Sequence, residues 1–376
     1  MYERIENYIE TLLNSSTPDA PLWNIESIRG GKKPHWNYID GCMMTALLCT
    51  WEITGEKKYF DFAEKFIDYY VQEDGSILGY SIEKYNLDDI NEGRVLFDLY
   101  QKTGKEKYKK AILLLRQQLE KQPRTNTGNF WHKQIYPNQI WLDGLYMAQV
   151  FYVRYQKEFG GKDYSDTINQ FKNVRRYMFD NDKKLYYHGM DCSKTAFWAD
   201  KSTGCSKNFW LRAMGWFCVS LVDNIDYIDD EAARNELITI FSEVMEGVSK
   251  YADKETGMFY QVIDQCGREG NYLETSGSSM IAYAMMKGAR LGVIDKKYSD
   301  FGQKTFDGIC EKYLTVNEEG NLNLGGICLV AGLGPEDNKR RDGSYEYYIS
   351  EPIVENDAKG VAPFLLCYTE VKRKKK

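Results

Sequence analysis

The chain of 376 residues is 43% hydrophobic and 28% charged and holds only eight prolines, a composition typical of a globular protein with a large core. Its net charge of −6 gives no electrostatic reason to expect nucleic acid or an acidic membrane surface as a partner. The first residues lack the basic start and apolar core of a secretory signal, and no stretch reaches the roughly 18 apolar residues of a membrane span. We therefore expect a cytoplasmic protein.

Metal and cofactor chemistry finds little support in the sequence. The three histidines, His35, His132 and His188, form no His-x-x-x-His pair, and no two of the nine cysteines have the spacing of a zinc or redox motif. The cysteines instead look like small buried residues of a reducing compartment. Phosphate-loop, nucleophile-elbow and dinucleotide-binding patterns are also missing, so we expect no metal and no cofactor.

The predicted elements begin with an amphipathic helix over residues 1–14, where one face carries Ile5, Tyr8, Ile9 and Leu12. Six apolar runs of helical length follow, and each starts near a glycine: Gly41, Gly93, Gly144, Gly215, Gly277 and Gly360. Because these runs are apolar on most sides, we expect inner helices that are covered all round. A polar turn and an amphipathic outer helix follow each of the first five runs, near Tyr59, Tyr108, Tyr164, Ala232 and Tyr298.

This repeated pair of an inner and an outer helix predicts the fold. The last inner helix has no outer partner after it, and the helix over residues 1–14 can take that place. Six inner and six outer helices make an all-α (α/α)6 barrel, a toroid of six helical hairpins. We expect one domain over residues 1–376, with a solvated basic tail at 372–376. The long segments 191–207 and 317–343 are expected to be functional loops.

All inner helices of such a ring run in one direction, so the residues at their starts are expected to surround one cavity. These residues are Asp40, Asp88, Asp89, Glu92, Asp143, Arg212, Thr275, Ser276, Asp357 and Lys359. Acidic residues also cap helix starts, and we interpret Asp89 as such a cap. Acids together with an arginine, histidines and tryptophans indicate carboxylate acid–base chemistry on a carbohydrate that carries its own carboxylate.

Several short segments occur in a fixed order between Trp36 and Val371. They are Trp131-His132-Lys133, Trp141-Leu142-Asp143-Gly144, Trp210-Leu211-Arg212, Glu274-Thr275-Ser276-Gly277 and Glu355-Asn356-Asp357-Ala358-Lys359-Gly360. In this order and spacing they resemble the unsaturated rhamnogalacturonyl hydrolases of glycoside hydrolase family 105. The resemblance implies an (α/α)6 barrel and an unusual reaction. C4 of a 4,5-unsaturated uronic acid is protonated, water adds at C5, and the resulting hemiketal opens to release the aglycone sugar.

The same resemblance assigns roles to individual residues. Asp143 matches the proton donor, which also acts as base toward the water, and Asp88 tunes Asp143 or holds a sugar hydroxyl. The candidate ligands of the unsaturated sugar and its carboxylate are Tyr38, His132, Lys133, His188, Trp210, Arg212 and Trp216. A glycine-rich loop that closes over the leaving sugar is expected at Gly332, Leu333 and Gly334. One carboxyl serves both steps only if it is neutral when substrate binds, so we expect the pKa of Asp143 near the working pH.

The leading hypothesis is a hydrolase of unsaturated galacturonyl-rhamnose from pectin. Its expected partner is a small oligosaccharide, without nucleic acid or membrane, and its expected state is a monomer or weak homo-oligomer. An unsaturated glucuronyl hydrolase acting on other lyase products is the alternative within the same chemistry. A sugar epimerase on the same barrel would use His132 and His188 as a pair across the cavity. A non-catalytic carbohydrate-binding protein would leave Asp143 beside Arg212 and Trp216 without a purpose.

Overall fold

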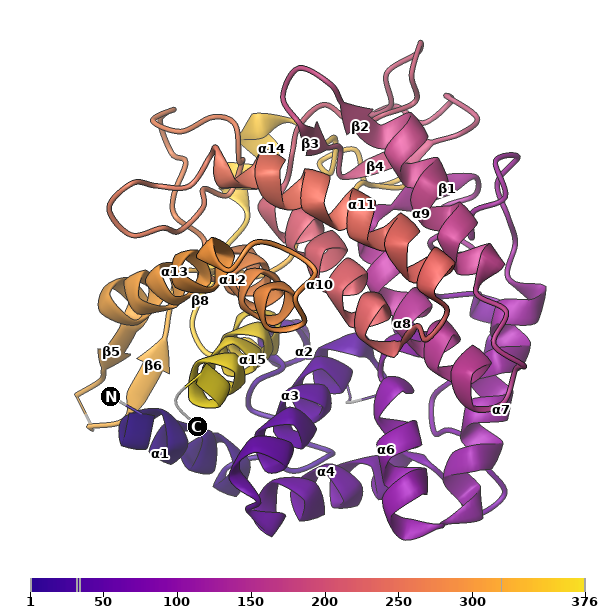
Figure 1. Cartoon of the computed structure of the whole chain (residues 1–376), viewed down its shortest axis with the longest axis vertical. Helices are drawn as coiled ribbons and strands as arrows, with labels where there is room; N and C mark the ends of the chain where they lie inside the picture. Colours follow the sequence, from indigo (N-terminus) through magenta and orange to yellow (C-terminus); the bar gives the residue numbers. More distant parts are fainter. Residues whose placement is uncertain (1, 32, 34, 319, 375–376) are drawn as a thin grey trace.

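Two concentric layers of helices make up the computed structural model, which describes residues 2–31, 33, 35–318 and 320–374 (Figure 1). The inner layer consists of α3 (Tyr38–Thr54), α6 (Arg94–Thr103), α8 (Leu142–Glu158), α10 (Leu211–Tyr227), α12 (Thr275–Arg290) and α15 (Ala358–Lys374). The outer layer consists of α1 (Tyr2–Asn14), α4 (Lys57–Tyr70), α7 (Glu106–Lys121), α9 (Ser165–Met178), α11 (Glu231–Ser249) and α13 (Lys297–Tyr313). Each inner helix contacts the next, and α15 contacts α3, so the ring is closed. The predicted (α/α)6 barrel is confirmed.

Burial follows the hydrophobic pattern of each layer. In α8 nearly every residue from Leu142 to Gln156 is buried, whereas in α4 a single face is buried, which carries Tyr59, Phe60, Ala63, Phe66, Ile67 and Tyr70. The inner helices are therefore covered by neighbours on all sides, and the outer helices cover them with one face.

Glycines let the inner helices approach one another at their starts. A Cβ atom on Gly277 of α12 would lie 2.4 Å from Cγ of Leu211 and 2.9 Å from the Leu211 backbone of α10. A Cβ atom on Gly215 of α10 would lie 2.8 Å from the sulfur of Met280 in α12. Distances this short exclude a side chain, so these two glycines set the spacing between α10 and α12.

The connections at the helix starts hold the short elements α2 (Ile25–Gly30), η1 (Ile82–Lys84), α5 (Asp88–Asn91) and α14 (Tyr345–Ser350). They also hold four antiparallel two-stranded sheets. The pairs are β1 (Gln139–Trp141) with β4 (Gly189–Asp191), β2 (Phe179–Asp180) with β3 (Leu185–Tyr186), β5 (Leu314–Val316) with β6 (Leu322–Leu324), and β7 (Ile327–Cys328) with β8 (Ile353–Val354). In the first pair Trp141 lies opposite Gly189, a register that positions part of the site.

The two ends of the chain meet where α1 packs beside α15 (Figure 1). The described part of the expected solvated tail, residues 372–374, is partly exposed and continues α15 to Lys374. Lys372 forms an ion pair with Glu6 of α1, and Lys374 pairs with Asp300 of α13 at 2.6 Å. Cations at a helix C-terminus complement the free carbonyl groups of its last turn, which accounts for the ordered basic segment. Residues 375–376 lie outside the described residues.

No helix in the described part of the chain combines the length and hydrophobicity that crossing a membrane requires.

Candidate active site

Backbone pairing between β1 and β4 brings Asp143 and His188 together. The Leu142 N–H, one residue beyond β1, donates to the carbonyl oxygen of His188, one residue before β4, at 3.0 Å. Asp143 therefore starts α8 directly beside the His188 ring, and Nε2 of His188 lies 3.3 Å from Oδ2 of Asp143. Two candidate residues from distant parts of the sequence are thus positioned by main-chain hydrogen bonds.

The same kind of pairing positions Asp88. The Leu87 N–H donates to the His132 carbonyl oxygen at 3.1 Å, and the His132 N–H donates to the Gln139 carbonyl oxygen at 3.0 Å. As a result, Oδ2 of Asp88 lies 2.5 Å from Nζ of Lys133, and Oδ1 lies 3.5 Å from Nε2 of His132. The segments around residues 87, 132, 141 and 188 form one continuous support for both carboxylates.

Gly144 makes room for this arrangement. A Cβ atom at Gly144 would lie 3.1 Å from Nδ1 of His132 and 3.3 Å from a methyl group of Leu87. A side chain there would push His132 away from Asp88. The glycine next to Asp143 is therefore a requirement of the site as well as of the helix repeat.

The two carboxylates are largely buried but keep a small exposed surface, while the imidazoles beside them are almost fully buried. The side chains of Asp143 and Asp88 are 12% and 13% exposed, and that of His188 is fully buried. Oδ2 of Asp143, Nε2 of His188 and Nδ1 of His132 have no well-aligned hydrogen-bond partner among the described residues. Because buried polar atoms are normally paired, unpaired atoms gathered at one place fit a site that binds a polar ligand.

Opposing effects determine the pKa of Asp143. Burial raises the pKa, but the neighbouring His188 and, more weakly, His132 lower it, and the result lies below the ordinary value of an aspartate. The expectation of a pKa near the working pH is therefore wrong for the ligand-free chain. Asp143 forms no ion pair with Arg212, and Asp88 is paired with Lys133 and His132.

The partners of Asp88 have defined charge states. Burial lowers the pKa of His132 to about 4 against the opposing effect of Asp88, so this imidazole is neutral at physiological pH. Burial also lowers the pKa of Lys133, but Asp88 outweighs burial and the pKa lies above its ordinary value. A neutral imidazole and an ammonium ion thus face one carboxylate.

An aromatic frame surrounds these polar groups. The Trp141 ring stacks on His132 at 4.5 Å and on Tyr136 at 4.7 Å, and it meets His188 edge-on at 5.4 Å. On the other side of His188, the Trp210 ring lies 4.8 Å away and stacks on Tyr348 at 5.9 Å. Aromatic faces of this kind present apolar surface with polar groups at their edges.

Tyr348 fixes the orientation of His188, since its hydroxyl lies 2.7 Å from Nδ1 of the imidazole. Burial raises the pKa of Tyr348 well above its ordinary value, so the hydroxyl keeps its proton. When the hydroxyl donates this proton to Nδ1, Nε2 is the ring nitrogen that bears a proton, and it faces Asp143.

Tyr38 and Trp216 lie together in a second aromatic group. The Trp216 ring stacks on Tyr146 at 4.2 Å and meets Tyr38 at 6.5 Å in an edge contact. Tyr38 starts α3 and is partly exposed, whereas Trp216 is buried. These two candidates therefore line the start of α3 and α10, and only Tyr38 offers accessible surface.

Arg212 is buried and bonded to the protein itself. Its Nε–H donates to Oγ of Ser276 at 2.7 Å, and the terminal N–H groups donate to the carbonyl oxygens of Cys328 and Leu329. Nη2 also lies 3.7 Å from the carboxylate of Glu274, the N-cap of α12. Arg212 forms no ion pair with Asp143, because these contacts hold the guanidinium against α12 and β7.

The segment of Gly332, Leu333 and Gly334 lies against the aromatic frame. Leu333 packs in a small apolar cluster with Tyr136, Trp141, Trp198 and Ala199. The Gly332 N–H donates to the hydroxyl of Tyr347 at 2.9 Å, and the Gly334 N–H donates to the Arg341 carbonyl oxygen at 2.8 Å. The loop is thus anchored next to Trp141, and its closure over the leaving sugar stays a prediction.

The remaining acids of the helix starts belong to the scaffold. Asp40 accepts from Nε1 of Trp23 at 2.8 Å, and Glu92 accepts from the Asn37 backbone at 2.9 Å. The interpretation of Asp89 as a cap is wrong. The side chain of Asn86 accepts from the Asp88 N–H, and the Asp89 carboxylate accepts from the Asn86 amide.

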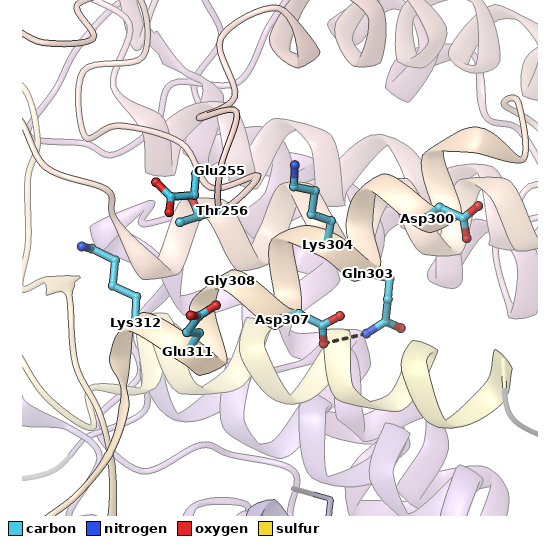
Figure 2. Close-up of a pocket in the computed structure, with 9 residues that line it drawn as sticks. All are labelled: Glu255, Thr256, Asp300, Gln303, Lys304, Asp307, Gly308, Glu311 and Lys312. Carbon is cyan, nitrogen blue, oxygen red and sulfur yellow. Dashed lines mark hydrogen bonds between the residues drawn. The ribbon is translucent and has the colours of Figure 1, made fainter.

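A groove on the outer surface runs along α13, away from these side chains (Figure 2). It is lined by Glu255, Thr256, Asp300, Gln303, Lys304, Asp307, Gly308, Glu311 and Lys312. None of them is a candidate site residue, and mixed charges on one outer helix are those of a solvated face.

Among the described residues, no group of three or more His, Cys, Asp or Glu is arranged to hold a metal ion.

Comparison with known proteins supplies the family. A sequence profile described as Glycosyl Hydrolase Family 88 matches residues 18–375. A solved glycoside hydrolase from family 105 of C. acetobutylicum ATCC 824 is 41% identical, with 99% of each chain covered and a TM-score of 0.91. The chain belongs to the glycosyl hydrolases of families 88 and 105. This family 88/105 hydrolase is therefore an enzyme, rather than the epimerase or non-catalytic binding protein considered from the sequence.

More distant relatives differ in the substrates that their names print. Unsaturated rhamnogalacturonyl hydrolase YesR of Bacillus subtilis (strain 168) is 24% identical over 298 residues, which are 77% of this hydrolase and 78% of YesR. Unsaturated glucuronyl hydrolase from Bacillus sp. GL1 is 12% identical, with 100% and 97% of the two chains covered and a TM-score of 0.68. The second likeness concerns the fold alone.

Sequence reasoning missed several residues that support the site of the family 88/105 hydrolase. Tyr348 orients His188, Tyr136 stacks on Trp141, and Gln139 accepts from Nε1 of Trp141 at 3.0 Å. No periodic pattern marks them, since they lie in short connecting elements. Their nearness in sequence to the segments that carry the resemblance was the one signal available, because Gln139 lies two residues before Trp141 and Tyr348 lies on α14, seven residues before Glu355.

Proposed function

We propose that this hydrolase removes the unsaturated uronic acid from lyase-generated disaccharides, with 4,5-unsaturated galacturonyl-rhamnose as its substrate. The observation that carries the proposal is the paired arrangement of Asp143 with His188 and of Asp88 with Lys133 and His132 around Trp141. Two carboxylates that keep a small exposed surface, polar atoms without a well-aligned hydrogen bond and aromatic rings suit a sugar ring with its hydroxyl groups.

Asp143 is proposed to act first as an acid and then as a base. Its carboxyl donates a proton to C4 of the double bond, which leaves positive charge shared between C5 and the ring oxygen. The resulting carboxylate takes a proton from a water molecule that adds at C5. The product is a hemiketal, which opens and releases the second sugar. This sequence regenerates the carboxylic acid and needs no covalent intermediate with the enzyme.

Binding of substrate must bring Asp143 to its protonated form. In the ligand-free chain its pKa is lowered by His188 and His132, so the carboxylate dominates at neutral pH. A substrate carboxylate nearby and the loss of water around Asp143 would both raise that pKa. The proposed reaction therefore couples substrate binding to proton uptake.

Asp88 is proposed to hold a sugar hydroxyl group or to tune the pKa of Asp143. Lys133 neutralises its charge, and both groups can hold hydroxyl groups of the unsaturated sugar. Tyr38, His132, His188, Trp210 and Trp216 are proposed to shape the sugar-binding surface. Arg212 is proposed to hold β7 and α12 in position rather than to bind the sugar, since protein groups already accept its hydrogen bonds.

The proposed rhamnogalacturonan substrate rests on the comparison with relatives. The name of YesR supports the rhamnogalacturonan substrate, whereas the glucuronyl hydrolase of Bacillus sp. GL1 shares only the fold. The expected single catalytic domain, cytoplasmic location and monomeric or weakly oligomeric state stay predictions.

The test is an assay with a panel of lyase products. The protein is incubated with unsaturated galacturonyl-rhamnose and with unsaturated disaccharides from glycosaminoglycans, and the ultraviolet absorbance of the conjugated double bond is followed. We expect the fastest loss of absorbance with galacturonyl-rhamnose. A faster reaction with glucuronyl substrates would transfer the assignment to that class, and no reaction with any unsaturated uronide would contradict the proposed chemistry.

A further inference from the structure

Arg341 differs from three charged neighbours in its loop. Three neighbours have partners: Lys339 pairs with Glu336 at 3.7 Å, Arg340 with Glu351 at 2.7 Å, and Asp342 with Lys207 at 3.5 Å. The Arg341 guanidinium forms no ion pair and no side-chain hydrogen bond within the described parts of the chain. It is half-buried, so part of its hydration is already lost.

The position of this guanidinium is set by Gly332 and Trp141. A Cβ atom on Gly332 would lie 3.3 Å from Nη1 of Arg341 and 3.4 Å from the outer edge of the Trp141 six-membered ring. Gly332 therefore leaves open the space between the cation and the ring. The other face and edges of Trp141 contact His132 and His188, which in turn face the two carboxylates.

The backbone that carries Arg341 is anchored, although its side chain is free. Its carbonyl oxygen accepts from the Gly334 N–H at 2.8 Å, and the Gly332 N–H is bonded to the Tyr347 hydroxyl at 2.9 Å. An unpaired guanidinium carried on an anchored backbone is suited to bind a planar anion through two hydrogen bonds.

We propose that Arg341 binds an anionic group on the leaving part of the substrate, beyond the unsaturated sugar. This inference rests on the proposed function and specifies the substrate class: oligosaccharides whose released part carries a carboxylate, such as a second uronic acid, or a sulfate ester. Among substrates that carry the unsaturated galacturonyl group, the enzyme then prefers those with an acidic released part over the neutral-aglycone disaccharide.

The experiment compares three substrates with wild type, Arg341→Gln, Arg341→Lys and the control Lys339→Gln. The substrates are unsaturated galacturonyl-rhamnose, the unsaturated tetrasaccharide that contains a second galacturonate, and a sulfated unsaturated disaccharide. We expect Arg341→Gln to lower kcat/KM about tenfold or more on the substrate whose anion Arg341 binds, and to leave the neutral-aglycone disaccharide unchanged. Arg341→Lys keeps part of the preference, and Lys339→Gln keeps all of it because Lys339 is exposed and paired with Glu336.

Binding provides a second readout that does not depend on turnover. Calorimetry in the Asp143→Asn background measures the same substrates, and we expect Arg341→Gln to weaken only the acidic ones. The acidic substrate whose binding Arg341→Gln weakens, the one with the carboxylate or the one with the sulfate, identifies the anion that Arg341 binds. Equal losses on all three substrates would place Arg341 at the unsaturated sugar itself, and no loss on either acidic substrate would also overturn the inference. A wild type without turnover but with the expected binding differences would contradict the proposed reaction and leave the role of Arg341 supported.

Discussion

At Asp143, burial and the neighbouring histidines act on the pKa in opposite directions, and the histidines prevail. The ligand-free site therefore holds a carboxylate at neutral pH, although the first proposed step requires a carboxylic acid. His188 is the larger of the two histidine effects, and its ring is held by Tyr348. Control over the proton donor thus depends on residues that do not themselves transfer the proton.

The first prediction concerns the pH dependence of kcat/KM, which reports ionisations of the free enzyme. Because the pKa of Asp143 lies below its ordinary value, its protonated fraction falls as pH rises through the neutral range. We expect kcat/KM on unsaturated galacturonyl-rhamnose to decrease about tenfold per unit of pH between about pH 5 and 8. In His188→Gln this decrease should begin at higher pH, because burial still raises the pKa of Asp143 while the main opposing effect is gone. Steady-state kinetics across pH measure both profiles.

Tyr348→Phe is the matched control, since it keeps the imidazole and removes only its hydroxyl partner. Its profile should lie between those of wild type and His188→Gln. A wild-type kcat/KM that is constant or rises with pH would contradict Asp143 as the proton donor.

The second prediction is that Asp143→Asn loses turnover and keeps binding. An amide cannot donate the proton, and general acid catalysis contributes about 10²- to 10⁴-fold, so we expect kcat to fall by that factor or more. Single-turnover absorbance and calorimetry measure rate and affinity. Asp89→Asn is the control, because Asn86 can donate to the new amide oxygen as it does to the carboxylate. Equal losses in both variants would indicate a structural effect rather than a lost proton.

At the level of elements, the sequence predicts the barrel better than it predicts the site. Apolar runs after spaced glycines indicate all the inner helices, because a helix that is buried on every side has an apolar local composition. Local composition does not predict the pairing of β1 with β4, since the α8–α9 hairpin separates the two strands in the chain. Asp143 and His188 could thus be named from the resemblance, while their contact and the resulting pKa required the folded chain. The partners of Arg212 were not predicted for a similar reason, because two of its acceptors are backbone carbonyl oxygens that no side-chain pattern reveals.

The third prediction tests the glycine spacing. Gly277→Ala should lower the free energy of unfolding by about 1–3 kcal/mol, because the new Cβ would overlap Leu211 of α10. This cost exceeds the gain of up to about 1 kcal/mol that alanine brings to a helix. Denaturant titration measures the difference. Gly325→Ala is the control, since its Cβ would have no neighbour closer than 3.7 Å. A Gly277→Ala variant as stable as wild type would show that α10 and α12 can separate without cost.

On the scale of the whole molecule, the two ends of the ring have different chemistry. The helix starts hold the proposed site, while the opposite end surrounds a cavity of about 220 Å³ to which all six inner helices contribute. Asp223 lies at its centre and accepts from Arg94 at 2.6 Å, from Lys287 at 2.9 Å and from Tyr283 at 3.0 Å. This buried network ties α6, α10 and α12 together.

The fourth prediction is that Asp223→Asn destabilises the chain without altering the chemistry of the site. It leaves Arg94 and Lys287 buried without their carboxylate, and breaking such a pair costs about 3–5 kcal/mol of unfolding free energy. Asp226→Asn should cost about 1 kcal/mol or less, because Asp226 pairs with the same Lys287 at 2.9 Å but is 37% exposed. Denaturant titration at neutral pH, with kcat of the folded fraction, measures both.

The pH dependence gives this network a further signature. Burial raises the pKa of Asp223, but Lys287 and Arg94 outweigh burial and lower it below its ordinary value. A group with a lowered folded-state pKa stabilises the chain above its unfolded-state pKa, and this contribution disappears as pH falls through the folded-state value. The stability difference between wild type and Asp223→Asn should therefore be largest at neutral pH and shrink in acid. A difference that is constant down to acidic pH would mean that Asp223 stabilises the ring by packing rather than by its charge.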